Sequence, residues 1–159
     1  MGAGILPYAE HNNKIYFLFS RELITGNVDP GLWSDFGGKS EKNESYFDTA
    51  VREGFEESSG FLGDQDTIKK LIEKKTLFQI NVNKYRTYII KIKYDKTLPK
   101  NFRDNFLKIK KTHPELVETK NGLHEKDQLK WIEITKLKDK ISLFRPWYRN
   151  IVRELLTRF

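Results

Sequence analysis

Apolar residues gather in short runs along the chain, and in some of these runs they alternate strictly with polar residues, as strands with one buried face do. The first two runs, at 3–8 and 14–19, flank the turn residues 11–13 and predict a hairpin. A short strand at 32–36 is expected to end on Gly37 and Gly38. Further strands are expected in the second half of the chain, at 76–82, 85–94 and 128–135.

At 45–58 the apolar spacing changes to that of a helix, because Phe47, Ala50, Val51, Gly54 and Phe55 fall on one side at about 100° per residue. The opposite side of this helix is acidic. Other helices are expected at 64–75, at 102–111 and from 146 onward, where a proline opens a strongly amphipathic stretch. Strands interspersed with helices predict an α/β fold with a mixed sheet covered on both faces.

The composition fits one globular domain. The chain has 159 residues, 38% of them hydrophobic and 13% aromatic, so we expect a single domain over 1–159. No apolar run approaches the roughly 18 to 20 residues that cross a bilayer, and no signal-peptide layout is present. We therefore expect an intracellular, cytoplasmic protein with no membrane partner. The lack of cysteine excludes disulfides, thiolate metal sites and cysteine nucleophiles.

Charge is divided unevenly along the chain. Residues 1–63 carry 5 Lys or Arg against 10 Asp or Glu, a net −5, whereas residues 64–159 carry 24 against 12, a net +12. A basic surface attracts phosphates or nucleic acid, although lysine-rich faces most often serve only to hydrate a surface. Phosphates and nucleic acid, including RNA, are therefore candidate partners of the basic half, while the oligomeric state stays open.

Three carboxylates stand out on the acidic side of the helix expected at 45–58. Glu53, Glu56 and Glu57 lie at i, i+3 and i+4, so their side chains share an arc of about 100° and repel one another. Positions 60 and 61 are Gly and Phe, so the helix supplies no basic partner at the usual spacing. Mg²⁺ or Mn²⁺ favours several carboxylate oxygens on a rigid element, whereas a plain solvated acidic face is the alternative.

The context of these residues resembles the Nudix box. That pattern is Gly, five residues, Glu, seven residues, Arg-Glu, an aliphatic residue, any residue, Glu-Glu, any residue, Gly and an aliphatic residue, and the chain reads GKSEKNESYFDTAVREGFEESSGF over 38–61. Its strongly determined positions all match: Gly38, Glu44, Arg52, Glu53, Glu56 and Glu57. Two positions differ, because Gly54 takes the aliphatic place and Ser59 takes the place of the closing glycine. We interpret Gly54 as a sign of close backbone packing and expect Gly60 to end the helix as its C′ residue.

The resemblance implies a fold and a set of roles. Nudix hydrolases are α/β/α sandwiches around a mixed sheet, and they hydrolyse a nucleoside diphosphate linked to another moiety. By this resemblance Glu53, Glu56 and Glu57 would hold Mg²⁺ or Mn²⁺, and Arg52 would brace Glu44 through a salt bridge. The water's proton would pass to Glu53 or Glu56, or to Glu125, which lies just before the strand expected at 128–135.

Substrate binding is less constrained by the sequence. Lys39, with Gly37 and Gly38, is placed to meet a phosphate. The basic segment 95–127 would suit a highly charged substrate, such as a dinucleoside polyphosphate, a diphosphoinositol polyphosphate or a capped RNA end. In that segment Phe102 and Phe106 either stack on a base or, as we favour, pack the segment onto the domain. A catalytically silent Nudix-like module that binds nucleic acid is the rival to the enzyme.

Overall fold

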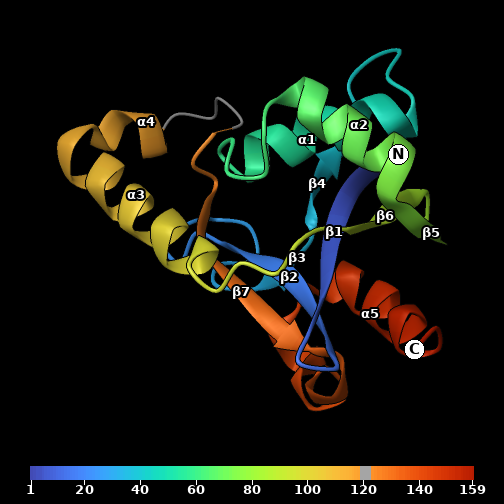
Figure 1. The fold of residues 1–159 in the computed structure, drawn as a ribbon. Coiled ribbons are helices and arrows are strands. Elements are labelled where there is room, and N and C mark those ends of the chain that lie inside the picture. Colours follow the sequence, from blue (N-terminus) through green and yellow to red (C-terminus); the bar gives the residue numbers. More distant parts are fainter. Residues whose placement is uncertain (119–122) are drawn as a thin grey trace.

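Strand β1 lies at the middle of the sheet in the computed structural model, which describes residues 1–118 and 123–159 (Figure 1). It pairs in parallel with β6 on one side and antiparallel with β2 and β4 on the other, so the sheet is mixed, as the sequence predicts. β5 extends the sheet beyond β6, and β3 and β7 pair with β2. The strands are β1 (Gly2–His11), β2 (Lys14–Glu22), β3 (Trp33–Ser34), β4 (Phe36–Lys39), β5 (Thr76–Val82), β6 (Tyr85–Lys91) and β7 (Lys126–Glu133).

Helices cover both faces of this sheet (Figure 1). The α-helices are α1 (Tyr46–Glu57), α2 (Gln65–Lys75), α3 (Leu98–Thr112), α4 (Pro114–Glu118) and α5 (Arg149–Leu156). Short 3₁₀ segments occupy Ile134–Lys136, Lys138–Leu143 and Pro146–Tyr148. Helices α1 and α2 pack on one face and α5 on the other, which is the α/β/α sandwich expected.

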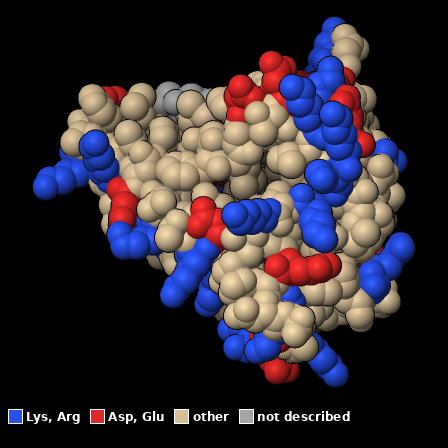
Figure 2. Space-filling view, in the orientation of Figure 1, with Lys and Arg blue, Asp and Glu red and all other residues tan. Residues whose placement is uncertain are grey.

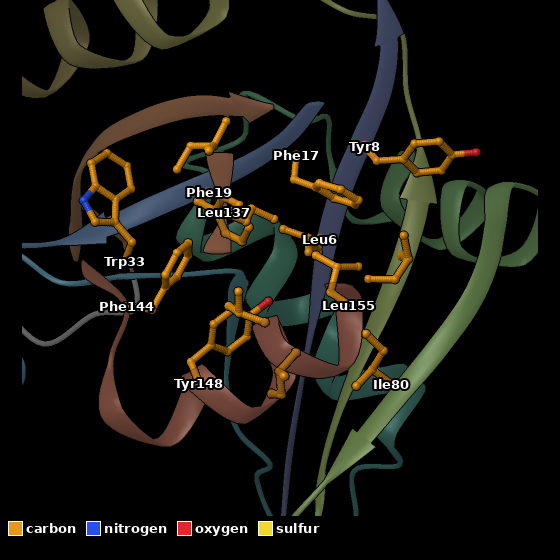
Figure 3. Close-up of a cluster of buried hydrophobic side chains, with 14 residues drawn as sticks. Leu6, Tyr8, Phe17, Phe19, Trp33, Ile80, Leu137, Phe144, Tyr148 and Leu155 are labelled. Carbon is orange, nitrogen blue, oxygen red and sulfur yellow. The ribbon is translucent and has the colours of Figure 1, made fainter. Parts of the chain in front are cut away.

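Strand β1, the first strand of the N-terminal hairpin, contributes side chains to two hydrophobic cores. Asn12 and Asn13 both have positive φ, 50° and 61°, which gives the tight turn with the twist that flanking strands prefer. Along β1, Ala3 and Ile5 face α1 and α2, whereas Leu6 and Tyr8 belong to the cluster under α5. Figure 3 shows that second cluster, with Leu6, Phe17, Tyr148 and Leu155 converging between the strands and α5. Burial on both faces therefore fixes β1 in register.

Helix α1 begins and ends on identifiable signals. Ser45 caps its N-terminus in a capping box with Asp48: each side chain accepts a hydrogen bond from the backbone N–H of the other residue. At the C-terminus the N–H of Ser59 donates to Glu56 O and the N–H of Gly60 donates to Phe55 O. This is a Schellman motif in which Ser59, with φ 49°, is the C′ residue. The expectation that Gly60 would be C′ is therefore wrong by one position.

Other boundaries also differ from the sequence prediction. Gly37 and Gly38 lie inside β4 rather than after it, because β4 pairs with the glycine-rich start of β1, where Gly37 faces Gly4. Helix α3 starts at Leu98, with Pro99 in its first turn, and not at residue 102. Phe102 and Phe106 are buried, so they pack α3 onto the domain, which is the alternative that the sequence favours.

The basic residues of the second half lie mostly on helices and connecting segments. Figure 2 shows lysine and arginine side chains spread over one face of the molecule, densest over α2. Part of the basic segment 95–127, namely 119–122, lies outside the described residues. Over the residues that are described, no helix combines the length and the apolar character needed to span a membrane.

Candidate active site

The acidic side of α1 is covered by other parts of the chain, although its sequence of charged residues is typical of a solvent-exposed helix face. Glu53 is only 9% exposed and Glu57 only 5%, while Glu56 is half-buried. The apolar side of the helix packs Ala50 and Gly54 on the sheet. The burial of both sides means that the carboxylates are held in fixed positions rather than moving freely in solvent.

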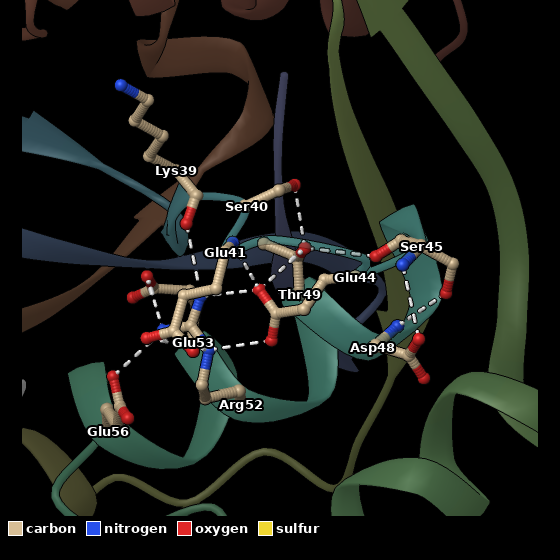
Figure 4. A network of polar contacts seen from close by, with 10 residues as sticks. All are labelled: Lys39, Ser40, Glu41, Glu44, Ser45, Asp48, Thr49, Arg52, Glu53 and Glu56. Carbon is tan, nitrogen blue, oxygen red and sulfur yellow. Dashed lines mark hydrogen bonds and ion pairs between the residues drawn. The ribbon is translucent and has the colours of Figure 1, made fainter.

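Arg52 ties the loop before α1 to the helix (Figure 4). Its Nε and Nη2 donate to the two oxygens of Glu44 at 2.8 and 2.9 Å, a bidentate pair, and Nη2 also donates to the carbonyl of Lys39 at 3.0 Å. The Arg52 guanidinium lowers the pKa of Glu44 to about 2. The salt bridge expected between Arg52 and Glu44 is thus present, and it fixes the loop against the helix.

The remaining nitrogen of Arg52 contacts the expected metal-binding carboxylates. Its Nη1 donates to Glu53 Oε1 at 2.9 Å and to Glu56 Oε2 at 3.2 Å. Figure 4 shows these contacts beside the two hydrogen bonds to Glu44, so the single guanidinium group donates hydrogen bonds to three carboxylates. Arg52 therefore partly neutralises the repulsion that the sequence leaves between Glu53 and Glu56.

Gly38 leaves room for the carboxylate of Glu53. A Cβ at Gly38 would lie 2.5 Å from Glu53 Oε1 and 2.7 Å from its carboxyl carbon, which is closer than a side chain permits. The pKa of Glu53 is raised to about 7, chiefly by burial and also by the charges of Glu56 and Glu125, while Arg52 acts to lower it. The glycine and the helix together enclose this carboxyl group.

Glu57 lies deepest and meets a lysine that the sequence prediction did not select. Its Oε2 is 3.2 Å from Nζ of Lys126, and Lys126 is itself fully buried and also donates to Glu22. Burial raises the pKa of Glu57 well above its usual range. Burial also lowers the pKa of Lys126, but the charges of Glu57 and Glu22 outweigh that effect and leave it above its ordinary value. In the sequence, the only sign that Lys126 belongs to the site is its position next to Glu125, at the start of a strand.

Two other expected site residues, Glu125 and Lys39, lie near the acidic cluster that Glu53, Glu56 and Glu57 form. The Glu125 charge raises the pKa values of Glu53, Glu56 and Glu57, so its half-buried carboxylate lies within electrostatic range of all three. Lys39 is exposed, and in Figure 4 its ammonium group points away from the Glu44–Arg52 network. Gly37 packs in the sheet, where a Cβ would meet Ala3 O at 2.6 Å, so it has a structural role in β4.

These residues fit a divalent cation. Glu57 Oε2 is buried and has no hydrogen bond besides its ion pair with Lys126, and Glu53 lies in the space that Gly38 leaves. All the candidate ligand atoms are hard carboxylate oxygens. Within 1–118 and 123–159, however, no three His, Asp or Glu side chains already form a metal-ligand arrangement. Arg52 holds Glu53 and Glu56, and Lys126 holds Glu57, so a cation would have to displace these contacts.

Comparison with solved structures identifies the fold. A Nudix hydrolase of M. smegmatis, RenU, superposes with a TM-score of 0.53 over 99% of this chain and 86% of its own, at 15% identity. A C. elegans Ap4A hydrolase gives 0.55 over 99% and 98%, at 18% identity. A bifunctional NMN adenylyltransferase/ADP ribose pyrophosphatase of Francisella tularensis, solved with AMP and a manganese ion, gives 0.55 over 98% and 41%, at 16% identity. The chain has the Nudix fold.

Sequence comparison is narrower. An uncharacterized protein of Acanthamoeba polyphaga mimivirus, L534, is 43% identical over 58 residues. These residues are 36% of this chain and 19% of that protein, so the match spans about a fifth of the relative. No family model matches the chain.

Proposed function

We propose that the chain is a divalent-metal-dependent pyrophosphohydrolase that cleaves the diphosphate linkage of a nucleoside diphosphate derivative. The observation that carries this proposal is the burial of Glu53 and Glu57 on the helix that also presents Glu56, with Glu57 Oε2 in an ion pair with Lys126 but without a hydrogen bond. Buried carboxylates without full hydrogen bonding are costly, so their placement on one helix is best explained by a ligand. A cation is the ligand that such oxygens favour.

Each residue then has a role that follows from its place. Glu53, Glu56 and Glu57 hold Mg²⁺ or Mn²⁺, which when bound neutralises the diphosphate and activates a water for attack on phosphorus. Arg52 keeps Glu44 and the loop fixed, so the carboxylates keep their spacing. Glu53, Glu56 or Glu125 takes the water's proton, and Lys39 contacts a phosphate beside Gly38.

The relatives support a choice of test substrates. One solved neighbour is named as an Ap4A hydrolase and another includes an ADP ribose pyrophosphatase. We therefore propose a screen of diadenosine tetraphosphate, ADP-ribose, a diphosphoinositol polyphosphate and capped RNA, each with Mg²⁺ and with Mn²⁺. Glu56→Gln and Glu57→Gln should each lower turnover at least about 100-fold, because each removes a charge that holds the metal. Glu73→Gln, an exposed position on α2, is the matched control and should retain wild-type turnover.

The silent binding module has one observation in its favour, since Arg52 already pairs with Glu53 and Glu56, and Lys126 with Glu57. A melting titration with Mg²⁺ and Mn²⁺ separates the two functions. The enzyme should gain thermal stability with either cation, and Glu57→Gln should lose most of that gain. No cation-induced shift in the wild type, together with no hydrolysis across the screen, would reject the enzyme in favour of the module.

A further inference from the structure

A cleft of about 390 Å³ adjoins the acidic cluster at Gly38. Its walls come from residues 1–2, from the end of β4, from the turn between β5 and β6, and from the segment just before α5. Gly38 belongs to both places, because it lines the cleft while its Cα lies against the Glu53 carboxylate. Gly38 is therefore the residue at which the cleft and the carboxylates of α1 come closest in the chain.

An aromatic ring forms one wall of this cleft. Trp147 is 38% exposed, although the next residue, Tyr148, is fully buried. Its ring packs on Tyr85, with centroids 4.8 Å apart, and on Tyr148 at 5.5 Å, and Pro146 starts the 3₁₀ segment that carries it. The Arg145 guanidinium lies 5.1 Å from the ring and is held by Glu22 and Asp29. Trp147 is thus a fixed, partly open surface for stacking.

Two lysines supply unpaired positive charge at the same cleft. Lys39 and Lys84 both line it, and neither makes an ion pair with any residue of the described chain. Lys84 is held in a two-residue turn in which Asn83 and Lys84 have φ of 49° and 60°, and its carbonyl accepts from the N–H of Gly2. Arg145 already has two carboxylate partners, so the lysines supply the cleft's free charge.

We infer that this cleft binds the nucleoside half of the substrate, with a neutral base stacked on Trp147 and its 5′ phosphates passing Lys39 and Lys84 toward Glu53. The inference rests on the proposed function for the position of the scissile linkage. A stacking wall beside two ammonium groups matches a planar apolar group attached to phosphates. The chemistry of the cleft therefore distinguishes between the dinucleoside polyphosphate, diphosphoinositol polyphosphate and capped RNA that the sequence leaves open.

Two of those substrates fit the cleft less well. A diphosphoinositol polyphosphate has phosphates but no planar ring, so it gains nothing from Trp147. A 7-methylguanine cap carries a positive charge on its base, which the unpaired ammonium group of Lys84 repels. A dinucleoside polyphosphate or another derivative of an unmethylated nucleoside diphosphate suits both the ring and the lysines.

The test compares ADP with inorganic pyrophosphate by calorimetry without added metal, because the two ligands share the diphosphate and differ in the nucleoside. The wild type should bind ADP at least about tenfold more tightly than pyrophosphate. Trp147→Leu should abolish that preference without weakening pyrophosphate binding, whereas Trp147→Phe should keep most of it. Lys84→Gln should weaken both ligands and flatten their salt dependence. GDP should bind more tightly than 7-methyl-GDP.

Matched controls are Trp131→Leu, which alters a partly exposed tryptophan on β7 away from the cleft, and Lys138→Gln; both should bind ADP as the wild type does. Three results would each overturn the inference. A folded Trp147→Leu variant could keep the wild-type preference for ADP over pyrophosphate, or the wild type could fail to bind ADP at millimolar concentration. The wild type could also bind 7-methyl-GDP more tightly than GDP. Hydrolysis of nucleotides with Trp147→Leu unaffected would reject the cleft and leave the enzyme standing. Trp147-dependent ADP binding without any hydrolysis would support the cleft and reject the enzyme.

Discussion

Ser59 shows how one residue departs from the box pattern at a definite cost. It occupies the C′ position of α1 with φ 49°, a left-handed conformation that an L side chain adopts less readily than glycine. Ser59→Gly should therefore raise the free energy of unfolding by roughly 0.5–1 kcal/mol, measured by urea denaturation. The control is Ser58→Gly, since Ser58 has φ −88° and its Oγ donates to Phe55 O. Equal gains from both substitutions would contradict the conformational explanation.

Gly37 and Gly38 are neighbours in β4, but the space that each leaves is filled by different groups. Alanine at 38 would meet the carboxylate of Glu53, at the end of a side chain, whereas alanine at 37 would meet backbone atoms of Ala3 and Gly4 at 2.6 Å. Gly38→Ala should lower turnover at least about tenfold with little change in melting temperature, because it displaces a carboxylate without disturbing the sheet. Gly37→Ala should instead lower the melting temperature. Kinetics and thermal melts of both variants test this, and a Gly38→Ala enzyme with wild-type turnover would contradict it.

At the scale of elements, Gly54 shows why α1 lies so close to the sheet. A Cβ there would lie 2.9 Å from Ile5 Cδ1 and 3.3 Å from Ile68 Cγ2, which confirms the close packing that the sequence suggested. Gly54→Leu, which restores the usual aliphatic residue, should destabilise the protein by roughly 1–3 kcal/mol through overpacking. Combining it with Ile5→Ala should recover part of that loss, measured as a double-mutant cycle. Strict additivity would show that the two residues do not compete for space.

Local patterns predicted α1 well and its surroundings poorly. The helical period and the Ser45 cap are encoded within a few residues, so the helix begins and ends within one residue of expectation. The same local pattern made its acidic side look solvated, because Lys126, which covers Glu57, comes from a strand far along the chain. Burial of a charged face depends on such distant partners, and no spacing within the helix reveals them. The positions of Gly37 and Gly38 were predicted wrongly for the same reason, since their partners Gly4 and Ala3 lie far away in the sequence.

At the scale of the whole molecule, a buried ionic network joins the acidic cluster to the cleft. Glu22 accepts from Lys126, which meets Glu57, and also from Arg145, which lies over Trp147. A residue on β2 thus fixes both the deepest metal-binding candidate and one wall of the cleft. The two places share this support, so under the proposed function a substrate that spans both has to match the distance between them.

Asp35 lies buried between β3 and β4, near the same network, and makes stability depend on pH. Tyr85 Oη donates to its Oδ1 at 2.8 Å and Thr87 Oγ1 to its Oδ2 at 2.9 Å. Burial raises its pKa from 3.8 to about 6, although these hydrogen bonds and the charges of Lys126 and Arg145 oppose the rise. The folded state therefore keeps the proton over a range of pH in which the unfolded state has lost it.

The sign of the effect follows from this difference. Below pH 3.8 both states are protonated and the contribution to stability is complete; between pH 3.8 and 6 it falls by about 1.4 kcal/mol per pH unit, and above pH 6 it is lost. Asp35→Asn cannot ionise and keeps polar atoms facing both hydroxyls, so the wild type should lose roughly 3 kcal/mol relative to this variant between pH 3.5 and 7. Urea denaturation across that range, with exposed Asp66→Asn as the control, measures the difference. Parallel pH profiles for wild type and Asp35→Asn would show that Asp35 does not hold its proton in the folded protein.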